Sequence, residues 1–153
     1  GAKLLYPDRT IQHGGIVLGI DGVAGHSHLG VPEADPGYFA RMVLAHEVSA
    51  VTGACLAIRA EVFAAVGGFD AEALKVAFND VDFCLRLLRA GYRNILDPGA
   101  VLIHAESASR GREVSARHLR EAALFRERWG ELLLDDPYLH PMLSTFRFTD
   151  RLG

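Results

Sequence analysis

Residues 77 to 86 read AFNDVDFCLR and join a polar, acidic start to an apolar run. The apolar side chains that follow recur at the three- and four-residue spacing of a helix with one buried face, at Phe78, Val81, Leu85 and Leu88. Gly91 ends the pattern. Asn79 is therefore predicted to be the helix N-cap, with Asp80 as the first helical residue and Asp82 as the third.

Strand-like segments lie on both sides of this helix. They are apolar or β-branched and end at Gly, Pro or Asp turns, at residues 2–7, 11–20, 48–59, 93–98 and 100–106. Further helices are predicted at 60–67 and 115–129, and residues 22–39 are predicted to be a long, functional loop. This order of elements indicates an α/β or α+β domain, of which we expect α/β.

Composition narrows the possible functions. The chain has 153 residues, half of them hydrophobic and 23% charged, which is typical of one globular domain. The formal net charge of -3 excludes a broad attraction to nucleic acid. Cys55 and Cys84 lie in apolar patterns and are predicted to be buried thiols of a reducing compartment. No apolar stretch reaches the roughly 20 residues of a membrane span.

The two aspartates have different structural explanations. Asp82, at the third helical position, can reach back to the N–H of the cap, as in a capping box. Asp80 lies on the first turn at a loop–helix junction, where the helix dipole keeps a carboxylate ionised. From spacing alone Asp80 is either another helix-stabilising acid or a general base, and both readings stay open.

The segment from residue 49 to residue 111 carries an ordered set of motifs. They are Gly53-Ala54 leading to Ile58-Arg59, GGFD at 67–70, the acidic pair at 79–80 followed by Asp82 and Leu85-Arg86, AGYR at 90–93, and His104. In this order they resemble the C-terminal half of the catalytic domain of family 2 glycosyltransferases, which are inverting enzymes with the GT-A fold. The flanks at 1–15 and 125–138 resemble the O-antigen or rhamnan-type subgroup.

The resemblance implies an α/β fold: the C-terminal half of a GT-A domain, with a mixed sheet and flanking helices, lacking the N-terminal nucleotide-binding βαβ half. Residues 1–153 would form a partial domain, with an acceptor-side core at 1–111 and a C-terminal helical segment at 112–153. We expect such a fragment to be inactive by itself and to self-associate through the surfaces that the other half would cover.

The resemblance also assigns roles to residues. Asp80 would be the base that removes the proton of the attacking acceptor hydroxyl, and Asn79 stands where the family usually has Glu. Gly53, Asn79 and Asp82 are expected to line the substrate site. His104 would be a ligand of Mn²⁺ or Mg²⁺ in the intact parent, beside an upstream Asp-x-Asp that this chain lacks; one imidazole alone does not hold such an ion.

Two loops offer further candidates. His28, with the neighbouring His26, is predicted to contact acceptor or leaving group. Arg110, together with Arg112 and the hydroxyls of Ser107 and Ser109, could close over a diphosphate or could form a solvated loop.

The partners implied are a nucleotide-diphospho-sugar donor, a saccharide or lipid-linked acceptor and the N-terminal half of the same domain. The expected location is the cytoplasm, at or near the inner face of the membrane. Two other classes stay open: a glycan- or protein-binding module in which Asp80 only stabilises a helix, and a metal-dependent hydrolase that uses His26, His28, Asp80 and His104.

Overall fold

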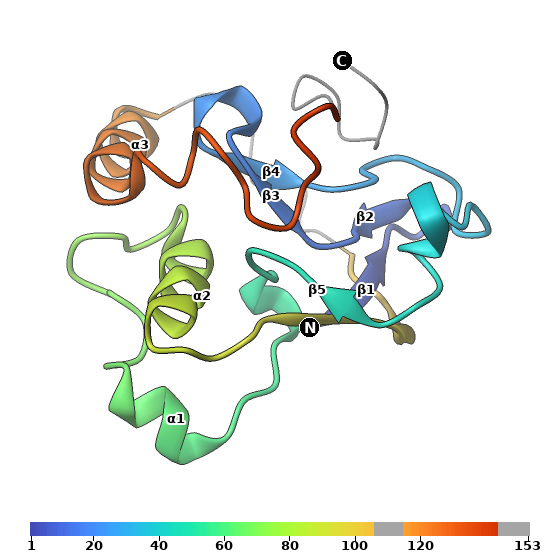
Figure 1. The fold of residues 1–153 in the computed structure, drawn as a ribbon, viewed down its shortest axis with the longest axis horizontal. Coiled ribbons are helices and arrows are strands. Elements are labelled where there is room, and N and C mark those ends of the chain that lie inside the picture. The colour runs from blue at the N-terminus through green and yellow to red at the C-terminus, as the bar shows by residue number, and fades with distance from the viewer. Residues whose placement is uncertain (106–114, 144–153) are drawn as a thin grey trace.

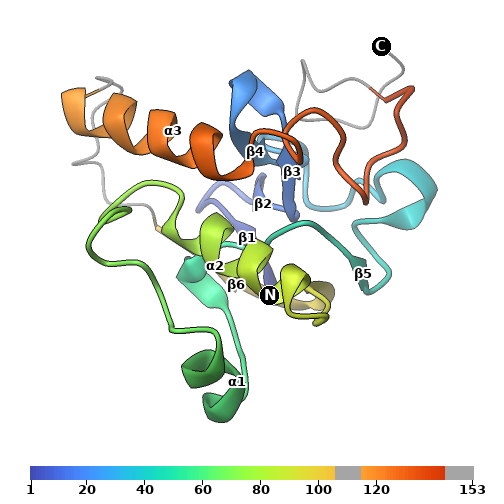
Figure 2. The same cartoon turned by 60° about the vertical axis from the view of Figure 1, so that its left-hand side comes forward.

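The computed structural model describes residues 1–105 and 115–143. Its strands are β1 (Ala2–Leu5), β2 (Ile11–His13), β3 (Ile16–Leu18), β4 (Ala24–His26), β5 (His46–Glu47) and β6 (Ile95–Ile103). Its helices are α1 (Ala60–Ala65), α2 (Asn79–Arg89) and α3 (Ala116–Trp129), with 3-10 turns η1 (Ile20–Gly22), η2 (Tyr38–Ala40) and η3 (Gly53–Cys55). The strands gather on one side, and α2 lies between α3 and α1 on the other (Figures 1 and 2). The mixed α/β class is confirmed.

The main sheet has four strands in the order β2-β1-β6-β5. β1 is buried along its whole length, runs antiparallel to β2 and parallel to β6, and so joins the beginning of the chain to residues about a hundred positions later. Among the described residues, β5 pairs with Ile95 and Leu96 of β6 alone. A second sheet consists of the antiparallel pair β3 and β4.

β6 was expected to be two strands separated at Pro98-Gly99, and this prediction is wrong. β6 continues through Pro98-Gly99, because its pairing with β1 shifts register there: Ala2 pairs with Asp97 and the next residue, Lys3, pairs with Val101. The β6 residues between these two pairs form a bulge. The carboxylate of Asp97 accepts a hydrogen bond from the Gly99 N–H, 2.9 Å away, which holds the turn inside the strand.

The single strand predicted at residues 11–20 is wrong in the opposite sense, because these residues form two strands, β2 and β3. Gly15 has a φ of 93°, a left-handed conformation that breaks the extended run and sends β3 to pair with β4 instead of β1. The long loop predicted at residues 22–39 contains β4 and the beginning of η2.

The strand predicted at residues 48–59 is also wrong. Val48, Ala50 and Val51 are buried, as a core strand would be, but Ala50 makes only an isolated bridge to Ile16. The chain then turns into η3, where Cys55 is half-buried rather than buried. An apolar run shows that a segment lies in the core and does not by itself show that it joins a ladder.

The core is continuous from the sheets to the last helix. Leu5 and Leu18 of the strands, Leu85 of α2 and Phe125 and Trp129 of α3 belong to one buried cluster. α3 begins and ends where it was predicted, with the Ser115 hydroxyl accepting a hydrogen bond from the His118 N–H. The proposed division of the chain near residue 111 stays a prediction.

The start of α2 differs from the prediction. Phe78, not Asn79, is the N-cap, and it adopts a left-handed conformation with a φ of 62°. Its ring packs between His118 and Phe125, with centroids 5.3 Å from each. Tertiary packing therefore overrides the cap preference of Asn79, which becomes the first helical residue and moves Asp80 to the second.

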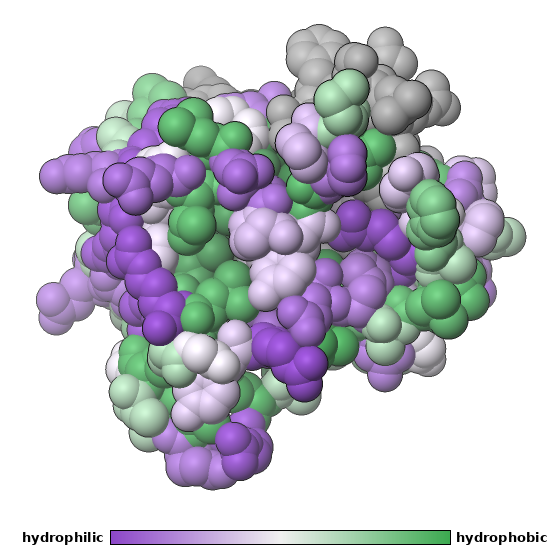
Figure 3. Space-filling view, viewed as in Figure 1, coloured by the Kyte–Doolittle hydropathy of each residue, from purple (hydrophilic) through white to green (hydrophobic). Residues whose placement is uncertain are grey.

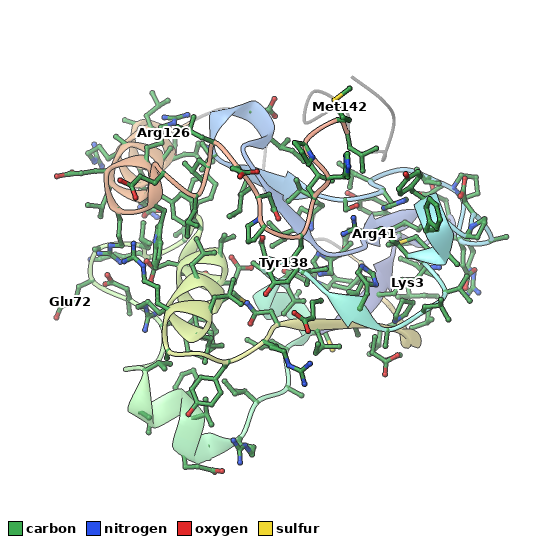
Figure 4. The ribbon with its side chains drawn as sticks, in the orientation of Figure 1. Lys3, Arg41, Glu72, Arg126, Tyr138 and Met142 are labelled. Carbon is green, nitrogen blue, oxygen red and sulfur yellow. The ribbon has the colours of Figure 1, made fainter. Side chains whose placement is uncertain are left out.

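The segment around η2 carries an apolar surface. Phe39, Val43 and Leu44 are well exposed, and hydrophobic atoms gather over this part of the molecule, at the right-hand edge of Figure 3. Lys3 of β1 is buried, and its ammonium group donates hydrogen bonds to the carbonyls of Glu33 and Met42 on either side of this segment (Lys3 is labelled in Figure 4, with Arg41 of the same segment nearby). The segment is thereby held against β1.

Candidate active site

A cavity of about 860 Å³ opens where the beginning of α2 meets the two sheets. Its walls come from many parts of the chain: the first residues of α2 and the segment before it, the turn at Thr52–Ala54, the hairpin of β3 and β4, strand β2, the ends of β1 and β6, and the first turn of α3. The predicted residues that line it are Gly53, Asn79, Asp80, His26 and His104. Segments far apart in the sequence thus converge on one open space.

Asp80 is held at the rim of this cavity by two backbone hydrogen bonds. Its Oδ2 accepts from the Gly53 N–H and its Oδ1 from the Val81 N–H, each at 2.9 Å. Both donors fix the orientation of the carboxylate at the start of α2. Asp80 is half-buried and is one of the residues that line the cavity.

The backbone of Gly53 lies next to the side chain of Asp80. A Cβ placed on Gly53 would lie 3.4 Å from the Cβ of Asp80 and 3.8 Å from its Oδ2, which is ordinary van der Waals contact. The role of this position therefore rests on the hydrogen bond that the Gly53 N–H donates to Asp80.

Asp82 has no exposed surface and lies away from the cavity lining. Its Oδ1 accepts from Arg128 Nη1 at 2.7 Å and Trp129 Nε1 at 2.9 Å, and its Oδ2 accepts from Arg86 Nε at 2.9 Å. The capping box expected of it is therefore wrong: a buried carboxylate needs paired donors, and Asp82 finds them on α3 and one turn along α2. It fixes the helix that carries Asp80.

The same arginines extend the network to the GGFD motif. Arg86 donates to the carbonyls of Val66 and Gly68, and Arg128 Nη2 donates to Asp70 Oδ2 at 3.0 Å. Backbone hydrogen bonding from Ala73, together with Arg128, lowers the pKa of Asp70. The GGFD motif, the start of α2 and the end of α3 are thus joined around the buried carboxylate of Asp82.

His104 lies at the end of β6, where its imidazole is held by Gln12. Nδ1 of His104 is 2.7 Å from Gln12 Oε1, and Gln12 Nε2 donates to the His104 carbonyl at 3.3 Å. Because an amide oxygen only accepts, the neutral ring carries its hydrogen on Nδ1 and its lone pair on Nε2. Histidines that bind a metal commonly have this tautomer, with the second ring nitrogen donating its N–H to a carbonyl or carboxylate group.

His104 nevertheless does not make a metal site with the residues described. Across residues 1–105 and 115–143, no three His, Cys, Asp or Glu side chains gather closely enough to hold a metal ion. The metal-dependent hydrolase hypothesis gains no support from this part of the chain. It requires four such residues together, and one of them, His28, is buried beside Ser27 and is not among the cavity-lining residues.

Arg110, Arg112, Ser107 and Ser109 lie outside the described residues, so their predicted diphosphate role stays a prediction. Sequence reasoning missed His118, whose ring lines the cavity from α3 and packs on Phe78. It also missed Gln12 and Thr52. Their sequence context is that of ordinary strand residues, so no local signal could have identified them.

None of the helices in the described part of the chain has the length and apolar character needed to cross a membrane.

Comparison with known proteins identifies the family. Residues 30–130 match the family described as glycosyltransferase like family 2. No solved structure matches the chain.

Curated relatives extend the likeness over nearly the whole chain. An uncharacterized protein of Sinorhizobium fredii, y4gI, is 49% identical over 96% of this chain and 17% of its own length. The O-antigen biosynthesis protein RfbC of Myxococcus xanthus is 38% identical over 94% of this chain and 11% of its own length. The chain therefore spans less than a fifth of either relative.

A third relative matches a shorter region. The N-acetylglucosaminyl-diphospho-decaprenol L-rhamnosyltransferase of Mycobacterium tuberculosis is 39% identical over 45% of this chain and 22% of its own length. The family match and these relatives agree with the ordered motifs around Asp80, and the chain belongs to glycosyltransferase family 2, with relatives of the O-antigen and rhamnosyltransferase type.

Proposed function

We propose that this chain forms the acceptor side of an inverting glycosyltransferase, which moves a sugar from a nucleotide-diphospho-sugar to a hydroxyl of a saccharide or lipid-linked acceptor. The observation that carries the proposal is the Asp80 carboxylate at the cavity rim, fixed by the Gly53 N–H at 2.9 Å. The names of the relatives support cell-surface polysaccharide synthesis as the process.

In the proposed reaction the acceptor hydroxyl donates a hydrogen bond to Asp80. Its oxygen attacks the anomeric carbon as the bond from that carbon to the diphosphate breaks, and its proton passes to Asp80. The nucleoside diphosphate leaves from the opposite face, so the configuration at the anomeric carbon inverts. A carboxylate has about four lone-pair positions, and the two backbone N–H groups leave room for the acceptor.

The donor side requires groups beyond those described. His104 offers one lone pair, and within residues 1–105 and 115–143 no carboxylate cluster lies beside it, so the proposed mechanism assigns no step to a metal ion. Mn²⁺ or Mg²⁺ stays a prediction for a parent protein that supplies further ligands, with Gln12 keeping His104 in the correct tautomer. We accordingly expect no transfer from the isolated chain, and a cytoplasmic location stays a prediction.

Two substitutions in the full-length parent test the role of Asp80. Asp80→Asn keeps the size of the side chain and removes its basicity, and should lower turnover by roughly 100-fold or more while acceptor binding is retained. Glu61→Gln is the matched control, because Glu61 is an exposed acid in the first turn of α1, away from the cavity lining. Nucleoside diphosphate release gives the rate, and NMR of the product gives the anomeric configuration.

Unchanged turnover in Asp80→Asn would remove the base from the proposal and favour a binding module. A retained anomeric configuration would exclude the single displacement.

A further inference from the structure

The turn from Thr52 to Cys55 presents four backbone N–H groups, and each has a different acceptor. Ala54 donates to the Thr52 hydroxyl at 3.3 Å and Cys55 to the Thr52 carbonyl at 3.4 Å. Gly53 donates to Asp80 Oδ2 at 2.9 Å. The first N–H of the turn, that of Thr52, donates to the Nε2 of His13 at 3.3 Å.

His13 is completely buried at the end of β2. Its other ring nitrogen, Nδ1, lies 2.8 Å from the Nδ1 of His26. The two rings meet nearly at right angles, with an interplanar angle of 84° and centroids 5.0 Å apart. Because His26 lines the cavity, a continuous line of hydrogen bonds runs from the cavity wall through His13 to the turn that binds Asp80.

The acceptors along this line determine where the hydrogens lie. His13 accepts from Thr52 at Nε2, so its neutral ring carries the hydrogen on Nδ1. That hydrogen is donated to His26, whose Nδ1 must accept and whose own hydrogen therefore lies on Nε2. Burial, with smaller contributions from His26 and the terminal amine, holds the pKa of His13 well below its usual value and keeps this ring neutral.

We propose that His13 is a positioning residue of the active site, which anchors the turn at Thr52 so that the Gly53 N–H meets Asp80, and which sets the tautomer of His26 at the cavity wall. The inference deepens the proposed function, because it rests on Asp80 being the base. His13 touches neither the cavity nor Asp80 and acts through Thr52 and His26.

If His13 only filled space in the core, an apolar residue of similar size would serve equally well at its position. At this position it would leave the N–H of the buried Thr52 without an acceptor, and an unpaired buried N–H is costly enough to move the turn. The polar atoms of His13 therefore have a function that its volume does not explain.

NMR of the 153-residue chain tests the tautomers directly. Long-range ¹H–¹⁵N correlation spectra of the imidazoles at neutral pH should show His13 protonated at Nδ1 only and His26 at Nε2 only. A His13 ring protonated at Nε2, or a His26 ring protonated at Nδ1, would overturn the proposal.

Hydrogen exchange tests the positioning. His13→Leu should speed exchange of the Gly53 amide by about tenfold or more relative to the wild type, and His13→Gln, whose side-chain oxygen can accept from Thr52, should restore most of the protection. Ile11→Val is the matched control, because Ile11 is equally buried on β2 and its change should leave Gly53 exchange unaltered. If His13→Leu fails to fold, the wild-type tautomers decide.

The two proposals fail in different ways. Unchanged Gly53 exchange in a folded His13→Leu chain refutes the positioning role, whatever the reaction is. Full turnover in Asp80→Asn refutes the base, while the link from His13 to Gly53 can still hold. In the parent enzyme, His13→Leu should lower kcat with little change in the KM for the donor, and His13→Gln should recover part of kcat.

Discussion

The carboxylate of Asp82 and the guanidinium of Arg128 meet at 2.7 Å inside the protein and join α2 to α3. Asp82 is completely buried, whereas Arg128 is about one-third exposed and also holds Asp70. The pair connects the helix that carries Asp80 to the segment that closes the core with Trp129. α3 therefore contributes to the site by fixing the helix that carries Asp80, in addition to placing His118 in the cavity wall.

Replacing Arg128 should destabilise the protein. Arg128→Met removes one donor from the buried carboxylate of Asp82 and also removes the ion-pair partner of Asp70. We expect the free energy of unfolding to fall by about 2 kcal/mol. This is less than for a fully buried pair, because Arg128 is partly exposed and Asp82 keeps its hydrogen bonds to Arg86 and Trp129. Urea unfolding followed by the fluorescence of Trp129, the single tryptophan, gives the value. Arg120→Met, at an exposed position of α3, is the control and should change stability by less than about 0.5 kcal/mol.

Acidification should weaken the fold through His13. The pKa of His13 is lowered in the folded protein, chiefly by burial, so below about pH 6.5 the unfolded chain takes up a proton that the folded chain does not. Unfolding free energy should therefore fall as the pH drops from about 7 toward 5, by at most about 1.4 kcal/mol per pH unit from this residue. The neighbouring titratable groups, His26 and the terminal amine, act in the same direction on the pKa of His13.

Urea titrations at several pH values measure this slope. His13→Gln should show a shallower dependence over the same range, since it has no titrating ring. An equal slope in the variant would assign the acid sensitivity to other groups.

The two cysteines should differ in reactivity. Burial raises the pKa of the Cys84 thiol to about 12, and its sulfur donates to the Val51 carbonyl, whereas Cys55 is half-buried in η3. Because the thiolate is the reactive form, iodoacetamide at neutral pH should label Cys55 in the native chain and leave Cys84 unlabelled. Mass spectrometry of the digested protein reads both positions, with urea-unfolded protein as the control in which both react. Native labelling of Cys84 would contradict its placement in the core.

The second half of β6 should promote self-association. Val101, Leu102 and Ile103 are 42%, 46% and 56% exposed, and among the described residues this stretch pairs only with β1. An open apolar edge is a template for another strand, so light scattering should show a mass that rises with concentration. Leu102→Lys should restore the monomer, and Leu134→Lys, at an 89% exposed position elsewhere, should not. A concentration-independent monomer for the unmodified chain would refute this expectation.

Periodic segments were predicted well from the sequence and irregular ones poorly. The apolar spacing of α2 and α3 gave both helices, because a helix repeats its contacts every three or four residues. The run at 48–59 has no such repeat, and its burial was mistaken for a strand. Similarly, the N-cap of α2 depends on where the Phe78 ring packs, and its partners His118 and Phe125 lie forty or more positions away in the sequence.

The candidate site shows the same limit. Asp80 and His104 were identifiable because they stand in ordered motifs, and both line the cavity. The residues that hold them, Gln12 for His104 and the turn at Thr52 for Asp80, come from strands and turns whose spatial neighbours no local pattern reveals. Asp82 resembled a cap in the sequence and proved to be the buried centre of a network with Arg86 and Arg128.

The parallel pairing of β1 with β6 has a consequence for folding kinetics. The hydrogen bond from Gly1 to the carbonyl of Ile95 spans 94 positions, so the centre of the main sheet closes a loop that contains most of the chain. Such non-local contacts are formed late and slowly, since the entropy of loop closure must be lost before the pairing contributes stability. During synthesis β1 emerges long before its partner, and the Asp80 site, which needs both sheets, can assemble only after β6 has left the ribosome.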